Sequence, residues 1–184
     1  HPDVDKITFT GSPAVGQQIQ REAVEGFKRV SLELGGKSPQ VVYSDANLDE
    51  AVAGCAMGIF FNQGQICAAG SRILVHEDIA EEFSARLAEV AKSIVVGNPG
   101  DDGVQMGPVA KKVQLDRVNN YIRIGVESGA KLLAGGESTY EQGWFVKPTV
   151  FGGATNDMVI AQEEIFGPVA TIISFKDEDE AVEV

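Results

Sequence analysis

The sequence contains few cysteines, an excess of acidic over basic residues and no long hydrophobic run. Its two cysteines, Cys55 and Cys67, do not make a disulfide framework, so we expect a reducing compartment and favour the cytoplasm. With 15 Lys and Arg residues against 27 Asp and Glu residues, the net charge of -12 argues against nucleic acid or an anionic membrane surface as a partner. No apolar run approaches the roughly 18 residues of a membrane-spanning helix, and the first residues lack the pattern of a signal peptide.

The sequence also lacks the common spacings of zinc ligands. It has two histidines, His1 and His76, and neither a C-x-x-C nor an H-E-x-x-H motif, so we expect no metal site. The first residue is His1 rather than methionine, and the acidic run at residues 177–184 is typical of the first turns of a helix. We therefore interpret the 184 residues as an internal segment of a longer polypeptide.

Strand and helix patterns alternate along the chain. Apolar periodicity predicts strands at residues 6–10, 29–34, 40–43, 73–76, 131–134, 144–150 and 169–175. Helices are expected at residues 13–25, after a cap at Asp45 or Asn47, after a capping-box-like start at Asp78 and Glu81, and at residues 110–128, with a loop at 161–168. This alternation predicts an α/β fold with a largely parallel sheet flanked by helices. The Gly35-Gly36 break suggests a boundary between domains at residues 1–35 and 36–184.

Cys67 lies between an apolar helical stretch and the strand predicted at residues 73–76. It is surrounded by amides, glycines and small residues (FNQGQICAAGS, residues 61–71), where the backbone can turn tightly and approach a ligand. A cysteine in this position can present a thiolate nucleophile to a cleft. The alternative is a small buried apolar side chain, which is the commoner state of a lone cysteine. Cys55 falls on the apolar stripe of the preceding helix, and we assign it to the core.

Two further candidate sites follow strands. Gly11 and Ser12 come directly after the first predicted strand, and Ser12 is a good N-cap for a helix that begins at Pro13. Such a helix terminus can bind an anion, although an ordinary capped helix explains the same residues. Glu33 lies at the end of the second strand beside Gly35, where a carboxylate could move toward a reacting group; a solvated or lysine-paired glutamate is the alternative.

Three motifs together resemble those of the NAD(P)-dependent aldehyde dehydrogenase superfamily. Residues 32–39 (LELGGKSP) are similar to the family's glutamate motif, residues 61–67 (FNQGQIC) to its cysteine motif, and residues 164–168 (EIFGP) to its cofactor-facing motif. They occur in the family's order and at its spacing, and the resemblance covers the whole chain. It implies that residues 1–35 are the end of a dinucleotide-binding domain and that residues 36–184 are most of an aldehyde dehydrogenase-like catalytic domain.

The resemblance implies a role for each matching residue. Cys67 would attack the aldehyde carbon to give a thiohemiacetal, with its backbone N–H as one oxyanion donor, and hydride transfer to the nicotinamide would leave a thioester. Glu33 would be the general base that activates water to hydrolyse this thioester. Glu164 would hold the nicotinamide ribose, Phe166 would pack beside it, and the other cofactor contacts would be Gly11, Ser12 and Gly35.

The same resemblance implies the cofactor, substrate and assembly. The cofactor is NAD or NADP, with NAD favoured, and the asparagine that completes the family's oxyanion hole lies outside the chain; Asn62 is expected to shape the turn instead. Phe60, Phe61 and Ile66 suggest an apolar tunnel mouth for a small-molecule aldehyde. Residues 64–72 look most like the hydrolytic, CoA-independent branch, of the phenylacetaldehyde type. The parent is expected to be a homodimer or homotetramer, and the isolated segment to have little or no cofactor turnover.

Two other functions are compatible with the sequence. Cys67 and His76 could form a thiol hydrolase or acyl carrier without redox chemistry, but His76 leaves Cys67 along a strand. Alternatively, the chain could be a non-catalytic structural segment that keeps the fold and has lost the activity. Titration with a thiol-alkylating aldehyde analogue, with and without NAD, separates these hypotheses.

Overall fold

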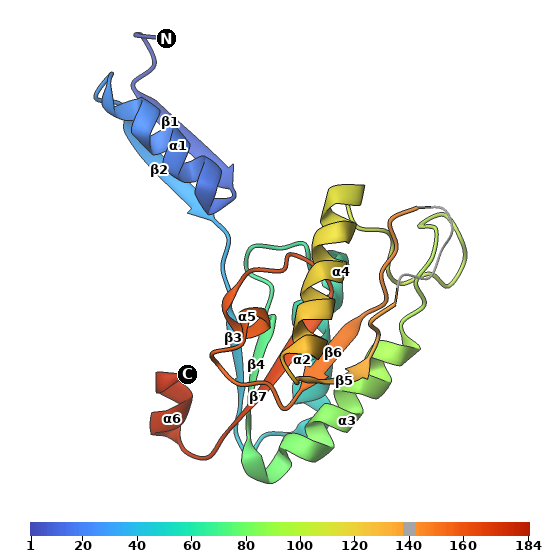
Figure 1. The fold of residues 1–184 in the computed structure, drawn as a ribbon. Helices are drawn as coiled ribbons and strands as arrows, with labels where there is room; N and C mark the ends of the chain where they lie inside the picture. The colour runs from blue at the N-terminus through green and yellow to red at the C-terminus, as the bar shows by residue number, and fades with distance from the viewer. Residues whose placement is uncertain (138–142) are drawn as a thin grey trace. The chain divides into compact units, whose positions relative to one another are not determined.

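The computed structural model describes residues 1–137 and 143–184, and the chain divides into two compact units (Figure 1). The first unit is His1–Gly36 and the second is Lys37–Val184. Each unit has its own secondary structure and its own packing.

The first unit is a strand–helix–strand element. β1 (Lys6–Gly11) and β2 (Arg29–Leu34) pair in parallel, and α1 (Pro13–Val24) connects them. The Ser12 hydroxyl oxygen accepts a hydrogen bond from the Val15 N–H at 3.4 Å and so caps the first turn of α1. Because serine before a proline at the first helical position favours a helix start, the sequence predicts the beginning of this helix correctly.

The second unit is built on a five-stranded sheet in the order β3-β4-β7-β6-β5. The strands are β3 (Pro39–Val42), β4 (Arg72–His76), β5 (Lys131–Ala134), β6 (Thr149–Gly152) and β7 (Val169–Phe175). All neighbouring pairs are parallel except β5 with β6, which is antiparallel. The predicted α/β fold with a largely parallel sheet is confirmed.

Helices cover both faces of this sheet. They are α2 (Leu48–Phe60), α3 (Glu77–Ser93), α4 (Lys112–Glu127) and the short α5 (Val159–Gln162) and α6 (Glu178–Glu183). Successive residues of β4 enter different cores: Ile73 and Val75 pack with α2 and α3, whereas Leu74 packs with α4 and α5. Alternate side chains of a strand point to opposite faces, so a nearly continuous apolar run indicates a sheet buried on both sides. In the described part of the chain, no helix has the length and apolarity needed to cross a membrane.

Three local predictions are wrong. The strand expected at residues 144–150 begins only at Thr149, and Pro148, immediately before it, has no N–H for a strand ladder. α3 begins at Glu77 rather than after Asp78, and its cap is the His76 ring, whose Nδ1 accepts a hydrogen bond from the Asp78 N–H at 3.3 Å. The loop expected from residue 161 begins after α5, because Ile160 and Ala161 are fully buried against the sheet and hold one helical turn there.

Candidate active site

Cys67 lies on the loop that carries the chain from α2 to β4. α2 ends at Phe60, and a 3-10 turn at Phe61–Gly64 follows it. Residues 65–71 then form what we call the cysteine loop, in which the Ala69 N–H donates to the Ile66 carbonyl at 3.0 Å. Cys67 is one of the two central residues of this turn, and it is exposed. The sulfur is therefore presented at the surface of the second unit.

The backbone before the cysteine loop is strained. Asn62 and Gln63 have φ values of 49° and 58°, and Gly64 has a φ of 66°. Left-handed residues other than glycine are uncommon and concentrate at functional sites, where the surrounding structure holds them in place. The Asn62 amide donates to the Gln65 carbonyl at 3.3 Å, so it shapes the turn as expected. The Gln65 side-chain oxygen accepts from the Ala110 N–H at 2.9 Å and ties the loop to the segment before α4.

The second candidate segment in this unit is the loop at residues 163–168, which we call the 163–168 loop. It joins α5 to β7 and carries Glu164, which is half-buried, and Phe166, which has a φ of 58°. A Cβ atom built on Gly64 would lie only 2.2 Å from the Gly167 carbonyl oxygen. The fold therefore packs the backbone leading into the cysteine loop directly against the 163–168 loop, although the two are far apart in the sequence.

One face of α4 holds the 163–168 loop in place. The Gln114 amide donates to the carbonyls of Ile165 at 2.9 Å and of Phe166 at 2.8 Å. Arg117 donates to the Glu164 carbonyl at 2.6 Å, and the Tyr121 hydroxyl donates to the Glu163 carboxylate at 2.6 Å. Burial, and after it this hydrogen bond, raise the pKa of Tyr121, so its hydroxyl stays protonated as a donor.

Sequence reasoning missed these three helix residues. Gln114, Arg117 and Tyr121 are spaced by three and four, the periodicity that puts side chains on one helix face. A polar stripe beside the apolar stripe of α4 was the available signal. The sequence alone does not assign this stripe to the site, because only the tertiary structure shows which loop faces it.

Lys37 introduces a buried cation near the 163–168 loop. Its Nζ is fully buried and has no hydrogen-bond partner among the described residues. Burial above all, and then the positive charge of Arg72, lower the pKa of the Lys37 amine from 10.5 to about 8, while the Glu164 carboxylate acts in the opposite direction. Glu164 therefore lies close enough to a buried amine to interact with it electrostatically.

The remaining predicted site residues belong to the first unit. Glu33 is exposed on β2 opposite Thr10 of β1, and Gly11 is opposite Leu34. The parallel pairing brings Gly11, Ser12, Glu33 and Gly35 together at the carboxyl ends of two neighbouring strands, the edge where ligands commonly bind in such sheets. Glu33 and Cys67 fall in different units, and their pairing stays a prediction.

Comparison with known proteins identifies the family. The model of the aldehyde dehydrogenase family matches residues 1–184. The chain belongs to the aldehyde dehydrogenase family. It is 50% identical over 185 residues to an aldehyde dehydrogenase of Emericella nidulans and 52% identical over 184 residues to retinal dehydrogenase 2 of Homo sapiens. These alignments cover 100% of this chain but only 37% and 36% of the two relatives, so the chain spans a little over a third of their length.

Solved aldehyde dehydrogenases share the fold over the whole chain. The NAD+ complex of an aldehyde dehydrogenase from Bacillus cereus superposes with a TM-score of 0.97 at 46% identity, covering 100% of this chain and 37% of that one. An NAD-dependent aldehyde dehydrogenase from Sinorhizobium meliloti superposes with a TM-score of 0.96 at 45% identity, covering 99% of this chain and 36% of that one. The resemblance found in the three motifs is thus confirmed at the level of the family.

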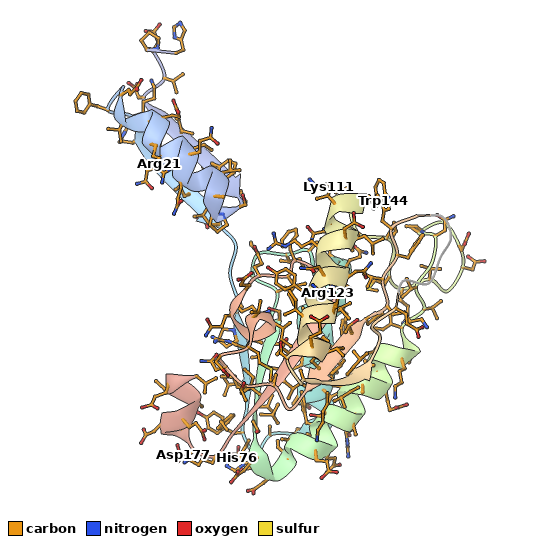
Figure 2. All side chains as sticks on the ribbon, viewed as in Figure 1. Arg21, His76, Lys111, Arg123, Trp144 and Asp177 are labelled. Carbon is orange, nitrogen blue, oxygen red and sulfur yellow. The ribbon has the colours of Figure 1, made fainter. Side chains whose placement is uncertain are left out.

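Two other residues with reactive side chains, Cys55 and His76, have structural roles in this aldehyde dehydrogenase chain. Cys55 is 4% exposed in the core, and burial raises the pKa of its thiol to about 11, in keeping with its assignment to the core. Figure 2 shows His76 at the carboxyl end of β4, where the chain enters α3. Its ring caps α3 and packs edge-on against Phe175 at 5.6 Å between ring centres, one full strand away from the cysteine loop. This position disfavours a Cys67–His76 pair.

The aromatic pair at the end of α2 divides between core and surface. Phe61 is 61% exposed, and Met57, one turn earlier, is 64% exposed. Phe60 is 5% exposed and belongs to the core with α2 and α3, and Ile66 is half-buried against the same core. The expectation that Phe60 lines a tunnel mouth is wrong, because consecutive helix positions point in different directions.

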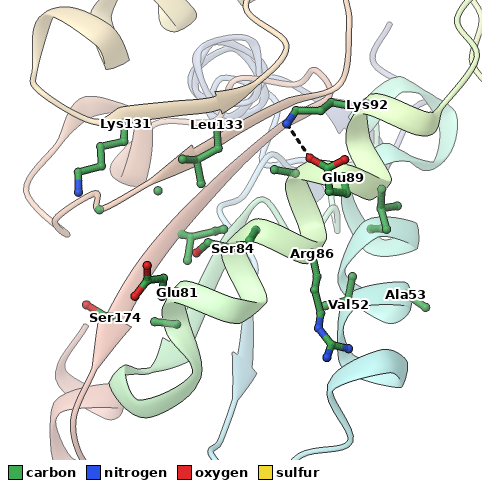
Figure 3. Close-up of a pocket in the computed structure, with 18 of the residues that line it drawn as sticks. Val52, Ala53, Glu81, Ser84, Arg86, Glu89, Lys92, Lys131, Leu133 and Ser174 are labelled. Carbon is green, nitrogen blue, oxygen red and sulfur yellow. Dashed lines mark hydrogen bonds and ion pairs between the residues drawn. The ribbon is translucent and has the colours of Figure 1, made fainter.

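A groove on the second unit contains none of the predicted site residues. It is a groove of about 1370 Å³ between α2, α3 and the sheet, lined by small and apolar side chains such as Val52, Ala53 and Leu133 (Figure 3). On its rim, the Lys92 amine is bonded to the Glu89 carboxylate at 2.7 Å (Figure 3). Within residues 1–137 and 143–184, no three His, Cys, Asp or Glu side chains are grouped so that they could hold a metal ion.

Proposed function

We propose that the full-length protein oxidises an aldehyde to a carboxylic acid with NAD, using Cys67 as nucleophile. The observation that carries this proposal is the contact of Gly64 with Gly167, which packs the segment before the exposed Cys67 against the loop with Glu164 and Phe166. Family membership supports the reaction class. The proposal concerns the full-length protein, because the chain covers only 36–37% of its relatives.

Each unit carries residues that suit one part of a dinucleotide. The capped N-terminus of α1 at Ser12, next to Gly11, offers backbone N–H groups and the positive end of a helix dipole to a pyrophosphate. Glu164 offers a carboxylate to ribose hydroxyls, Phe166 offers a ring surface, and Gly35 leaves room for close approach. When bound, NAD supplies the acceptor for the hydride that the substrate carbon loses. The NAD+ complex of the Bacillus cereus relative supports NAD over NADP.

The chain's own residues supply the covalent and proton-transfer steps. The Cys67 thiolate attacks the aldehyde carbon, a C–S bond forms, and the Cys67 backbone N–H stabilises the oxyanion. Oxidation of this carbon leaves an acyl group on sulfur. The Glu33 carboxylate then takes a proton from water, the water oxygen attacks the thioester, and the C–S bond breaks to release the acid and the thiolate.

The substrate is proposed to be apolar, and phenylacetaldehyde is our candidate. The exposed side chains of Met57 and Phe61, next to the cysteine loop, support an apolar approach to the sulfur. Comparing kcat/KM for phenylacetaldehyde, acetaldehyde and betaine aldehyde tests this choice, and we expect the first to be highest. A higher value for betaine aldehyde would overturn it.

The activity itself is tested with the full-length protein and two variants. We expect the wild type to form NADH from an aldehyde, Cys67→Ala to form none, and Glu33→Gln to release about one NADH per active site and then stall at the thioester. Cys67-dependent ester hydrolysis without NADH formation from any aldehyde would instead support a hydrolase. If neither activity depends on Cys67, the non-catalytic alternative holds.

Assembly and compartment complete the proposal. We propose a homodimer or homotetramer in the cytoplasm, in keeping with one buried and one exposed free cysteine. Residues 1–184 alone are proposed to lack cofactor turnover, since the oxyanion asparagine of the family lies outside them. Sedimentation of the full-length protein and NADH formation by the isolated 184 residues check these points.

A further inference from the structure

A half-buried glutamine lies between the sheet, α2 and the cysteine loop. Gln40 is the second residue of β3, and its side chain is on the same strand face as Val42, which packs in the core with α2 and α3. Its amide donates to the Gly70 carbonyl at 2.7 Å and to the Cys55 carbonyl at 3.3 Å. One side chain thus joins three segments: the first strand of the sheet, the middle of α2 and the end of the cysteine loop.

Two glycines leave the space that the Gln40 side chain fills. A Cβ atom on Gly58 would lie 2.7 Å from the Gln40 Oε1 atom, and a Cβ on Gly70 would lie 2.4 Å from its Cδ atom. These glycines also bond each other directly, since the Gly70 N–H donates to the Gly58 carbonyl at 3.1 Å. Gly54, one turn earlier on α2, has no atom within 4 Å of its built Cβ. The close packing is therefore confined to the turn of α2 that faces Gln40.

The Gln40 amide acts on the segment that presents Cys67. Gly70 comes three residues after Cys67 and directly follows the Ile66–Ala69 turn. The start of the cysteine loop is fixed separately, through Gln65 and Ala110. Gln40 fixes the other end of the loop, and the turn that carries the sulfur is held between these two anchors.

We propose that Gln40 is a positioning residue for Cys67: by holding the Gly70 carbonyl against α2, its amide sets where the cysteine loop presents the sulfur. This inference rests on the proposed function for its catalytic consequence. Its structural part, the control of the sulfur's position, can be measured without any turnover. A misplacement of about 1 Å at a reacting group can cost roughly 100-fold in rate.

The experiment uses the full-length protein with Gln40→Met, which keeps the length and loses the donor, and Gln40→Glu, which turns a carboxylate toward two carbonyl oxygens. We expect kcat to fall about 10- to 100-fold in both, with the aldehyde KM within about threefold of wild type. We also expect the rate of Cys67 alkylation by iodoacetamide to fall at least about threefold. A protonated glutamate can donate one hydrogen bond, so the deficit of Gln40→Glu relative to wild type should shrink as the pH is lowered.

Gly58→Ala and Gly54→Ala are a matched pair that leaves Gln40 itself unchanged. Both add one methyl group to α2, but only the first meets the Gln40 amide. We expect Gly58→Ala to lower kcat and the Cys67 alkylation rate, and Gly54→Ala to leave both unchanged. Because this pair does not depend on the folding of the Gln40 variants, it decides the question if those variants do not fold.

Unchanged kcat and unchanged alkylation in the folded Gln40 variants, or equal behaviour of Gly58→Ala and Gly54→Ala, would overturn the inference. Failure of the proposed function is recognised separately, as a wild type without Cys67-dependent NADH formation. In that case the alkylation rates alone decide whether Gln40 positions the sulfur.

Discussion

The contact between Gly64 and Gly167 should make Gly64→Ala one of the most damaging small substitutions in the second unit. Gly64 has a φ of 66°, a conformation that costs an L-residue with a side chain about 1–2 kcal/mol. The added methyl carbon would also lie 2.2 Å from the Gly167 oxygen and 2.6 Å from its carbonyl carbon. These are backbone atoms, so no side-chain rotation relieves the clash.

The expected magnitude combines the two effects. Overpacking of a close-packed site costs about 1–3 kcal/mol, so with the backbone cost Gly64→Ala should lower the free energy of unfolding by about 2–5 kcal/mol. An ordinary contact begins at 3.4 Å, so the turn at Gly64 that leads into the cysteine loop and the 163–168 loop must separate by about 1 Å. A displacement of this size at a reacting centre can lower kcat/KM roughly 100-fold.

The assay is equilibrium unfolding in urea together with NADH formation, on the full-length protein. Gly54→Ala is the matched control, because it lies in the middle of α2 with nothing within 4 Å of its built Cβ. This control should gain about 0.5–1 kcal/mol, since alanine is favoured over glycine inside a helix. If Gly64→Ala keeps full activity and unfolds within about 1 kcal/mol of the control, the close approach of the two loops does not constrain the site.

Three more outcomes follow from the geometry. Gln114→Leu removes both hydrogen bonds to the 163–168 loop and should raise the cofactor KM by about tenfold, measured by NAD titration, at a cost of about 1–3 kcal/mol in unfolding free energy. Iodoacetamide at neutral pH should label Cys67 and leave Cys55 unmodified, as read by peptide mass spectrometry, because burial raises the pKa of the Cys55 thiol to about 11. Lys37→Met should raise the unfolding free energy by up to roughly 3 kcal/mol below pH 8, because burial lowers the pKa of this amine from 10.5 to about 8. The folded state releases the Lys37 proton first, so this gain should shrink as the pH rises from 8 to 10.5 in pH-dependent urea unfolding.

Each of these outcomes has a matched comparison. Gln114→Glu keeps the side-chain shape and loses the amide donor, so its NAD affinity should resemble that of Gln114→Leu. Wild-type NAD affinity in both variants would show that α4 does not contribute to cofactor binding. Labelling of Cys55 at the rate of Cys67 in the native protein would contradict the burial argument. Lys111 is exposed, so Lys111→Met should show no comparable pH-dependent gain in the free energy of unfolding. An equal gain in this control would show that burial of Lys37 is not the cause.

Local sequence signals predicted much of the secondary structure and the state of both cysteines. Ser12 before Pro13, and Asn47 before the apolar stripe of α2, cap the helices where expected, because capping depends on residues within one turn. Cys55 falls on a stripe with Val52 and Ile59 and is buried, whereas Cys67 stands among glycines and amides and is exposed. Where two local signals competed, prediction failed: the His76 ring caps α3 in place of Asp78.

The sequence by itself determined the alternation of strands and helices, the family and the residue types available for chemistry, because these depend on periodicity and on motifs of a few adjacent residues. Only the tertiary structure decided which of those motifs meet. The contact of Gly64 with Gly167, the polar face of α4 on the 163–168 loop, and the Gln40 amide between α2 and the cysteine loop all join segments distant in the chain. Such contacts are set by how two helical layers pack on one sheet, and no local pattern encodes that packing.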